Sequence, residues 1–161
     1  MISIITDRKR LREPSEAVSF SEGSRIGQIL VEELSKRNDA LGLAAPQIGI
    51  KACVFAIKNK EEIYYVINPK ILSQKDKFLF KKEGCLSFPG QNLITIRHNE
   101  IEVIDDRIAN PMILTGVESV CFQHELQHLQ GGLFFDSEVK IYDSCFCGSG
   151  KKLKFCCLKD N

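Results

Sequence analysis

The chain has 161 residues, enough for one domain with a hydrophobic core and a small appendage. Its 22 Lys and Arg residues balance its 21 Asp and Glu residues, which argues against a dedicated nucleic-acid-binding protein. No apolar run is long enough to span a membrane, and the N-terminal residues lack the pattern of a signal peptide. We therefore expect a cytoplasmic protein with no membrane partner and no specific nucleic-acid partner.

The first predicted element is an amphipathic helix over residues 24–38, where apolar side chains recur at helical spacing. Residues 1–23 before it are predicted to be irregular, and residues 41–50 after it to form a loop rich in small residues. Short apolar runs predict strands over residues 52–57, 63–67, 71–72, 78–80, 94–96 and 101–104.

A second helix is predicted to follow the strands. It begins at Thr115, where Thr-Gly-Val-Glu matches a capping box, and ends at Gly131. Its apolar residues occupy two faces, which indicates a helix buried on both sides. The uneven order of strands and helices predicts an α+β fold of mostly antiparallel sheets around this central helix.

The central helix carries the strongest chemical signal, a His-Glu-x-x-His pattern within residues 123–128. His124 and His128 lie one turn apart on a helix, so both imidazoles can bind one metal ion. Glu125 lies beside them, where it can hold or deprotonate a metal-bound water. The alternative is a pair of core histidines that are satisfied by hydrogen bonds. Two buried imidazoles need polar partners, however, and a metal supplies them.

A metal ion with three protein ligands keeps a position for water, which is the catalytic arrangement. Cys85 is the candidate third ligand, because Gly84 before it allows close backbone approach. A hydrolase also needs hydrogen-bond donors for an oxyanion, and the Leu86 backbone N–H and the Gln47 amide are candidates. Taken alone, Cys85 would be a buried structural cysteine and Gln47 a loop residue that bonds local backbone.

Cysteines are concentrated at the end of the chain. Four of the seven lie in the last seventeen residues: Cys145, Cys147, Cys156 and Cys157. In a reducing compartment such a cluster indicates a metal site before it indicates disulfides. Four thiolates suit a closed structural Zn(II) site, and a segment this short needs the metal to fold. Cys53 and Cys121 are predicted to be small buried hydrophobes.

Three motifs together make the chain resemble the peptide deformylase family. Residues 40–47 are similar to its Gly-apolar-Gly-apolar-Ala-Ala-x-Gln stretch, and residues 83–87 read Glu-Gly-Cys-Leu-Ser. Residues 123–131 match Gln-His-Glu-x-x-His-Leu-x-Gly. The joint order and spacing of the three are far more specific than any one motif. The resemblance covers roughly residues 4–136.

The resemblance implies an enzyme that removes the formyl group from the N-terminal formylmethionine of nascent polypeptides. Cys85, His124 and His128 would hold the catalytic metal, which is Fe(II) in this family, with Zn, Ni or Co able to substitute. A metal-bound water would attack the formyl carbon, with Glu125 as general acid/base.

The same resemblance implies roles around the metal. Gln47 and the Leu86 N–H would stabilise the oxyanion, and the Gly42 backbone would pair with the extended substrate. Val120 and Cys121 would line the pocket for the methionine side chain. The full set of implied substrate-binding residues is Gly42, Gly84, Val120 and Cys121.

The chain departs from the family pattern at several positions. Ala40 replaces the first glycine of its motif, and Gln127 replaces an aspartate that would lie near Arg97. We therefore predict that Arg97 pairs with Glu83 instead. A C-terminal helix found in many members is not expected here. Shortened deformylases occur in phages and organelles, so the expected location is the cytoplasm, or the host cytoplasm for a phage protein.

The tail resembles a second family. Residues 145–157 are similar to the SEC-C zinc motif at the end of the preprotein-translocase motor ATPase. The predicted organisation is therefore a catalytic domain over residues 1–140 and a four-cysteine zinc-binding motif, a small zinc knuckle, over residues 141–161. In relatives the motif contacts proteins or ribosomes, which implies the ribosome or another protein as a partner. The alternative role is a stabilising cap on the catalytic domain.

Two other functions compete with deformylation. One is a metalloprotease or amidase of different specificity, although ordinary His-Glu-x-x-His proteases use a third His or Glu rather than Cys85. The other is an inactive module that binds peptides or ribosomes. The joint presence of Gln47, Cys85, Glu125 and both histidines favours the enzyme.

Overall fold

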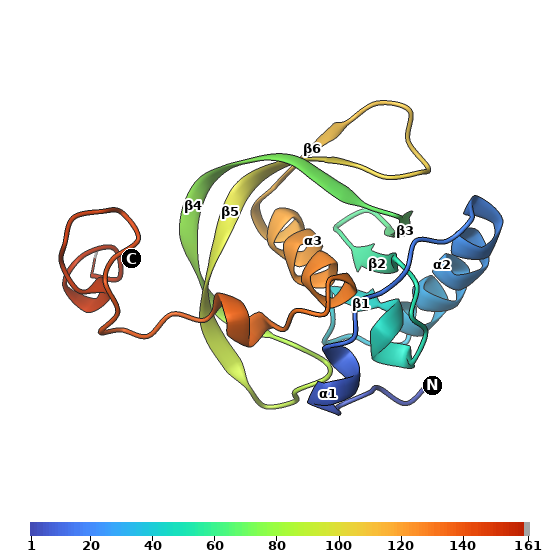
Figure 1. The fold of residues 1–161 in the computed structure, drawn as a ribbon, viewed down its shortest axis with the longest axis horizontal. Helices are drawn as coiled ribbons and strands as arrows, with labels where there is room; N and C mark the ends of the chain where they lie inside the picture. Colours follow the sequence, from blue (N-terminus) through green and yellow to red (C-terminus); the bar gives the residue numbers. More distant parts are fainter. Residues whose placement is uncertain (160–161) are drawn as a thin grey trace.

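Helix α3 (Gly116–Leu129) lies between two antiparallel sheets in the computed structural model, which describes residues 1–159 (Figure 1). The predicted α+β class with mostly antiparallel sheets is confirmed. The first sheet has the order β1-β2-β3 and the second β4-β5-β6. The other elements are α1 (Arg8–Leu11), α2 (Phe20–Ser35), β1 (Gly42–Ala44), η1 (Ala45–Ile48), β2 (Val54–Lys58), β3 (Ile63–Ile67), β4 (Lys70–Gly84), β5 (Asn92–Ile104), β6 (Met112–Thr115), η2 (Phe134–Ser137) and η3 (Leu153–Phe155).

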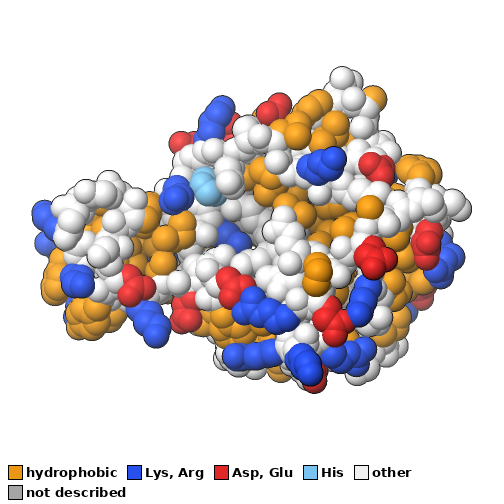
Figure 2. Space-filling model, viewed as in Figure 1, with side chains coloured by type: hydrophobic (Ala, Val, Ile, Leu, Met, Phe, Trp, Pro, Cys, Tyr) orange, Lys and Arg blue, Asp and Glu red, His pale blue; other side chains and the backbone are white. Residues whose placement is uncertain are grey.

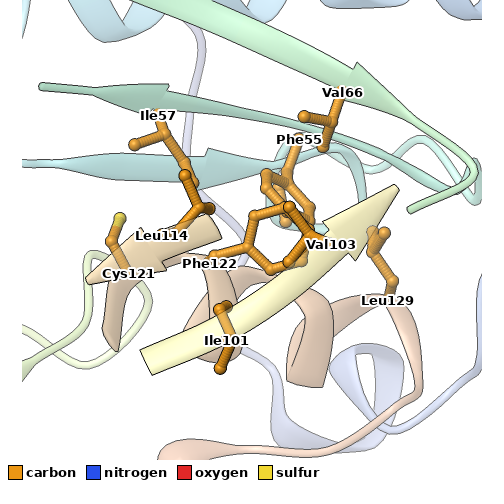
Figure 3. Packing of buried hydrophobic residues seen from close by; sticks show 10 residues of the cluster. Phe55, Ile57, Val66, Ile101, Val103, Leu114, Cys121, Phe122 and Leu129 are labelled. Atoms are coloured by element: carbon orange, nitrogen blue, oxygen red, sulfur yellow. The ribbon is translucent and has the colours of Figure 1, made fainter. Parts of the chain in front are cut away.

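Strand β2 places α2 and α3 on opposite faces of the first sheet, because side chains alternate along a strand. Val54 and Ala56 pack with α2. Phe55 and Ile57 point the other way and pack with α3 (Figure 3). Phe55 meets Phe122 of α3 edge to face, with ring centroids 5.0 Å apart. This core fixes the position of α3 against the first sheet, and α3 carries the two histidines of the His-Glu-x-x-His pattern.

The second sheet is dominated by the long hairpin of β4 and β5. The predicted short strands over residues 71–72 and 78–80 are parts of β4, and those over residues 94–96 and 101–104 are parts of β5. Most side chains along β4 are exposed and polar. These polar residues separate its apolar runs, so the sequence pattern predicted two short strands rather than one long one. Strand β6 was not predicted, because three of its four side chains are exposed.

Three local predictions are wrong. Residues 1–23 are not wholly irregular, because they contain α1 and the start of α2, and α2 spans Phe20–Ser35 rather than residues 24–38. The Ser19 side chain accepts the Glu22 N–H and so starts this helix earlier than its apolar spacing indicated.

Residues 41–50 are not a loop but contain β1 and η1, because Leu43, Ala44 and Ala45 are fully buried and β1 pairs with β2. Thr115 precedes α3, but its side chain makes no capping hydrogen bond. Glu118 instead accepts hydrogen bonds from Tyr64 Oη at 2.7 Å and from Asn59 Nδ2 at 3.2 Å.

Residues 141–159, called the C-terminal module below, form a small lobe beside β4 and β5 (Figure 1). Figure 2 shows this lobe at the left, with apolar side chains both on the side that faces the rest of the protein and on its outer, lower side. Asp160 and Asn161, which end the predicted zinc-binding motif, lie outside the described residues. Among the described helices, none is both long and apolar enough to cross a membrane.

Candidate metal centre

Three potential metal ligands converge where α3 meets the end of β4. His124 and His128 are both buried and their ring centroids lie 5.0 Å apart, as expected for positions four residues apart on a helix. Cys85 directly follows β4, and its Sγ lies 3.3 Å from His128 Nε2. One ligand atom from each of the three residues lies within 4.8 Å of the others. One thiolate and two imidazoles form a donor set that suits Fe(II) or Zn(II).

His124 is oriented by a carboxylate behind it. Glu83 Oε1 lies 2.7 Å from His124 Nδ1, so a proton on Nδ1 leaves Nε2 available to bind a metal. Glu83 also accepts hydrogen bonds from Arg97 Nε at 2.9 Å, from Arg97 Nη2 at 2.5 Å and from Thr95 Oγ1 at 2.5 Å. The predicted Arg97–Glu83 pair is therefore confirmed, and both side chains are about 95% buried.

Ionisation of this carboxylate follows from its partners. Burial opposes the charge on Glu83, but the hydrogen bonds of Arg97 and His124 outweigh it and lower the pKa of Glu83 to about 2. Arg97 was expected to pair with Glu83 instead of the residue at position 127, but it contacts both, because Gln127 Oε1 accepts a hydrogen bond from Arg97 Nη2 at 2.9 Å. Gln127 Nε2 donates to the Leu133 carbonyl at 2.8 Å. A neutral amide thus lies beside Arg97, where the resemblance implied an aspartate.

Two buried polar atoms at this centre have no hydrogen-bond partner among the described residues: Glu125 Oε2 and His128 Nδ1. Such atoms are rare in folded proteins and usually mark the position of a ligand, ion or water. Burial raises the pKa of Glu125 to about 7. The donor set and the unpartnered carboxylate oxygen together fit a metal ion with a reactant beside it.

Gln47, on η1, lies beside Cys85. Its Oε1 accepts the Ala44 N–H at 2.9 Å, which leaves the amide nitrogen pointing the other way. Gln47 Nε2 donates to Ser87 Oγ at 3.2 Å and lies 3.7 Å from Cys85 Sγ. The side chain therefore presents a hydrogen-bond donor next to the candidate metal ligand.

A cavity of about 470 Å³ opens beside these groups. It is lined by most of the residues implied by the sequence: Gly42, Gln47, Gly84, Cys85, Leu86, Val120, Cys121, His124 and Glu125. His128 is 1% exposed and is not part of the lining. Sequence reasoning missed Phe88, Val117, Lys82 and Asn92, which also line it. Val117 lies on the helix that the sequence predicts to be buried on both sides, but it is 52% exposed where it lines this cavity.

One of the cavity residues that sequence reasoning missed, Lys82, has an unusual backbone conformation. Lys82 adopts a φ of 63°, a left-handed conformation that is unfavourable for lysine. It lies where the pairing of β4 with β5 shifts register between Phe80 and Glu83. Such bulges redirect side chains next to functional sites. Nothing in the local sequence pattern predicts this bulge.

The four C-terminal cysteines also come together. Their sulfur atoms all lie within 4.8 Å of one another, and Cys147 Sγ is 3.3 Å from Cys145 Sγ. A short antiparallel bridge between Ser144 and Lys152 closes the loop that carries the first pair. Four thiols at this separation suit one tetrahedral metal ion.

Comparisons with known proteins agree on one family. The polypeptide deformylase family model matches residues 2–142. Peptide deformylase 1B of rice chloroplasts is 33% identical over 108 residues, which cover 62% of this chain and 40% of the rice protein. A peptide deformylase of Natranaerobius thermophilus is 35% identical over 127 residues, which cover 73% of this chain and 80% of that protein. The crystal structure of peptide deformylase from Thermus thermophilus covers 86% of each chain, with a TM-score of 0.77 and 31% identity.

Proposed function

Because the chain belongs to the peptide deformylase family, we propose that it removes the formyl group from the N-terminal formylmethionine of nascent polypeptides. The observation that carries this proposal is the convergence of Cys85, His124 and His128 beside the unpartnered Glu125 carboxylate. The aligned region covers less than half of the rice relative, so the activity rests on this geometry as well as on the family. We place the reaction in the cytoplasm, or in the host cytoplasm for a phage protein.

Cys85, His124 and His128 would hold the catalytic ion, with Fe(II) as the proposed metal and Zn, Ni or Co as substitutes. The ion would supply an acidified water and polarise the formyl carbonyl. Glu125 would take a proton from the attacking water and deliver it to the leaving amine. Its burial and its place next to the histidines support this role.

Gln47 and Leu86 would stabilise the charge that develops on the formyl oxygen. The Gln47 amide is held by Ala44 and Ser87, so it is preorganised to donate a hydrogen bond. The backbone N–H of Leu86 follows the Cys85 ligand directly, and Leu86 lies on the cavity wall. Preorganised donors of this kind lower the barrier because they need no rearrangement during the reaction.

Gly42 would bind the peptide backbone, and the apolar wall would receive the methionine side chain. A Cβ at Gly42 would collide with the Glu125 carboxylate and the Cys121 thiol, so only glycine allows close approach there. Gly84, Val120 and Cys121 complete the proposed substrate contacts along the cavity. An extended peptide would pair with the β1 edge in strand fashion.

A direct assay tests the proposed activity. Anaerobically prepared Fe(II)-loaded protein is expected to release formate from a formyl-Met peptide and to leave an acetyl-Met peptide intact. This selectivity would require that the cavity wall beside Glu125 admits the formyl hydrogen and excludes the larger methyl group of an acetyl. Hydrolysis of both peptides would indicate a general amidase, and hydrolysis of neither by metal-loaded protein would contradict the proposal.

We further propose that residues 1–140 form the catalytic domain and that residues 141–161 form a separate Zn(II)-binding motif. The clustered sulfurs support the motif, because Cys147 Sγ contacts both Cys145 Sγ and Cys156 Sγ. The exposed side of the C-terminal module would contact the ribosome or another protein. Phe155 and Tyr142 are 59% and 56% exposed, and Lys154 Nζ lies 5.3 Å from the Tyr142 ring.

Ribosome binding can be tested with an exposed residue of this surface. Phe155→Ala is expected to lower co-sedimentation with ribosomes several-fold without changing the thermal stability, because more than half of the side chain is exposed. An equivalent change far from the module, Phe20→Ala, serves as control, since Phe20 is 58% exposed on α2. Equal co-sedimentation of Phe155→Ala and unchanged protein would refute docking through this surface.

A further inference from the structure

We propose that the C-terminal module holds strand β5 in position behind the catalytic metal centre, so that Leu153 and Ile96 act as positioning residues for the metal ligand His124. The inference rests on the proposed metal binding at both sites. It assigns the C-terminal metal a role in the reaction that is separate from any docking function.

The module covers the outer face of the β4–β5 hairpin. Leu153 and Cys145 are 1% and 6% exposed, and they form one buried cluster with Leu79 of β4. Ile94 and Ile96 of β5 pack against the same cluster. The module is therefore joined to the sheet by apolar side chains from both strands. Ile94 and Ile96 lie on the stretch of β5 whose other face contacts Glu83.

The inner face of the same stretch of β5 holds the carboxylate that orients His124. Neighbouring side chains on a strand point to opposite faces, so Thr95 and Arg97 face inward where Ile94 and Ile96 face outward. Thr95 and Arg97 are almost fully buried, and both donate hydrogen bonds to Glu83. Any shift of β5 that uncovers its outer face would therefore move the partners of Glu83 as well.

Backbone contacts strengthen this connection. The Val139 N–H donates to the Ile94 carbonyl at 2.9 Å, and Glu138 forms an antiparallel bridge with Thr95. The chain that leads into the module thus pairs with β5 at Thr95, one of the residues that bond Glu83. A displaced module would pull on this pairing directly.

The module depends on a metal to keep its shape. Its fully buried contribution to the cluster is Cys145 and Leu153, which is far too little apolar surface for an independent core. Cys145 also belongs to the four-sulfur group, so a bound ion would fix the side chain that packs on Leu79. Loss of this ion would free Leu153 from the sheet and loosen the support of His124.

The test uses full-length protein with Zn(II) in the C-terminal site and Co(II) at the catalytic centre. Cobalt bound by one thiolate and two imidazoles absorbs visible light, so loss of this absorption after addition of a chelator gives the release rate. Leu153→Ala is expected to release Co(II) about tenfold faster, the size typical of changes to the partners of metal ligands. The KM for formyl-Met peptide should change little, because neither Leu153 nor Ile96 lines the cavity.

Matched variants separate positioning from general damage. Phe155→Ala lies in the same short helix but is 59% exposed, so its release rate should equal that of the unchanged protein. Leu153→Ile should restore slow release, since it returns most of the buried volume. Ile96→Ala should act from the sheet side in the same direction, and the double variant should be less than additive.

Two results would overturn the proposal. One is an unchanged Co(II) release rate in folded Leu153→Ala protein, whether or not zinc is retained. The other is full additivity of Leu153→Ala and Ile96→Ala, because independent sites add and coupled sites do not. If Leu153→Ala does not fold, Leu153→Val and Ile96→Val allow the same comparison. Release is measured without turnover, so a failed deformylation assay would leave this test intact.

Discussion

Glu125→Ala is expected to lower the turnover of formyl-Met peptide by about 10²–10⁴-fold while the catalytic metal stays bound. Glu125 is not among the three clustered ligands, so its loss should leave the donor set of Cys85, His124 and His128 intact. The reaction would lose the group that moves the proton from water to the leaving amine. Steady-state kinetics combined with metal analysis measures both parts of the expectation.

A second glutamate of the same helix provides the control for this variant. Glu118 also lies on α3, but its carboxylate accepts hydrogen bonds from Tyr64 and Asn59 and is not one of the candidate site residues. Glu118→Ala should therefore keep kcat close to that of the unchanged protein, with a small loss of stability. Turnover retained by metal-loaded Glu125→Ala would exclude Glu125 as the general base.

Glu83→Ala is expected to reduce the free energy of unfolding by about 3–5 kcal/mol, the usual cost of leaving a buried charge without its partner. Arg97 is 5% exposed and directs two nitrogens at Glu83, so the variant would strand the guanidinium inside the protein. His124 would also lose the carboxylate that orients its ring. Urea unfolding with both metal sites loaded, and again after chelation, separates the two effects.

Two comparisons sharpen this prediction. The double variant Glu83→Ala and Arg97→Met should regain much of the stability, because it removes the stranded charge, but should still bind the catalytic metal weakly. Glu100→Ala breaks an exposed pair with Lys75 on the same hairpin and should cost less than about 1 kcal/mol. If Glu83→Ala lowered the free energy of unfolding by as little as Glu100→Ala does, Arg97 would have found another partner.

The candidate ligands could be predicted because their chemistry depends on local pattern. Residues four apart on a helix share a face whatever the rest of the fold is, so His124 and His128 were predictable from spacing alone. The four C-terminal cysteines were predictable as a cluster for a similar reason, since a short segment must bring them together. The Arg97–Glu83 pair was predicted from a departure in one motif, and the structure confirms it.

Predictions failed where side-chain exposure was uneven. The hairpin of β4 and β5 was predicted as separate short strands, because polar residues interrupt the apolar pattern of both strands. These residues are mostly exposed along β4, but along β5 they include the buried Arg97. The segment around Gly42 was predicted as a loop, because a short run of small residues carries no periodicity that distinguishes a buried strand from a turn. Both errors concern the elements that form the walls of the cavity.

By itself, the sequence determined the types of the candidate ligands, the helical spacing of His124 and His128, and the α+β class, all of which follow from periodicity and residue chemistry over short distances. Only the tertiary structure decided which segments distant in the chain meet. It brings Cys85 to His128, aims Gln47 at Cys85, and places Leu153 on the back of the strand that supports Glu83. Such contacts depend on the register of β4 and β5 and on the packing of α3 between two sheets. Those are properties of the whole folded chain, and no short stretch of sequence encodes them.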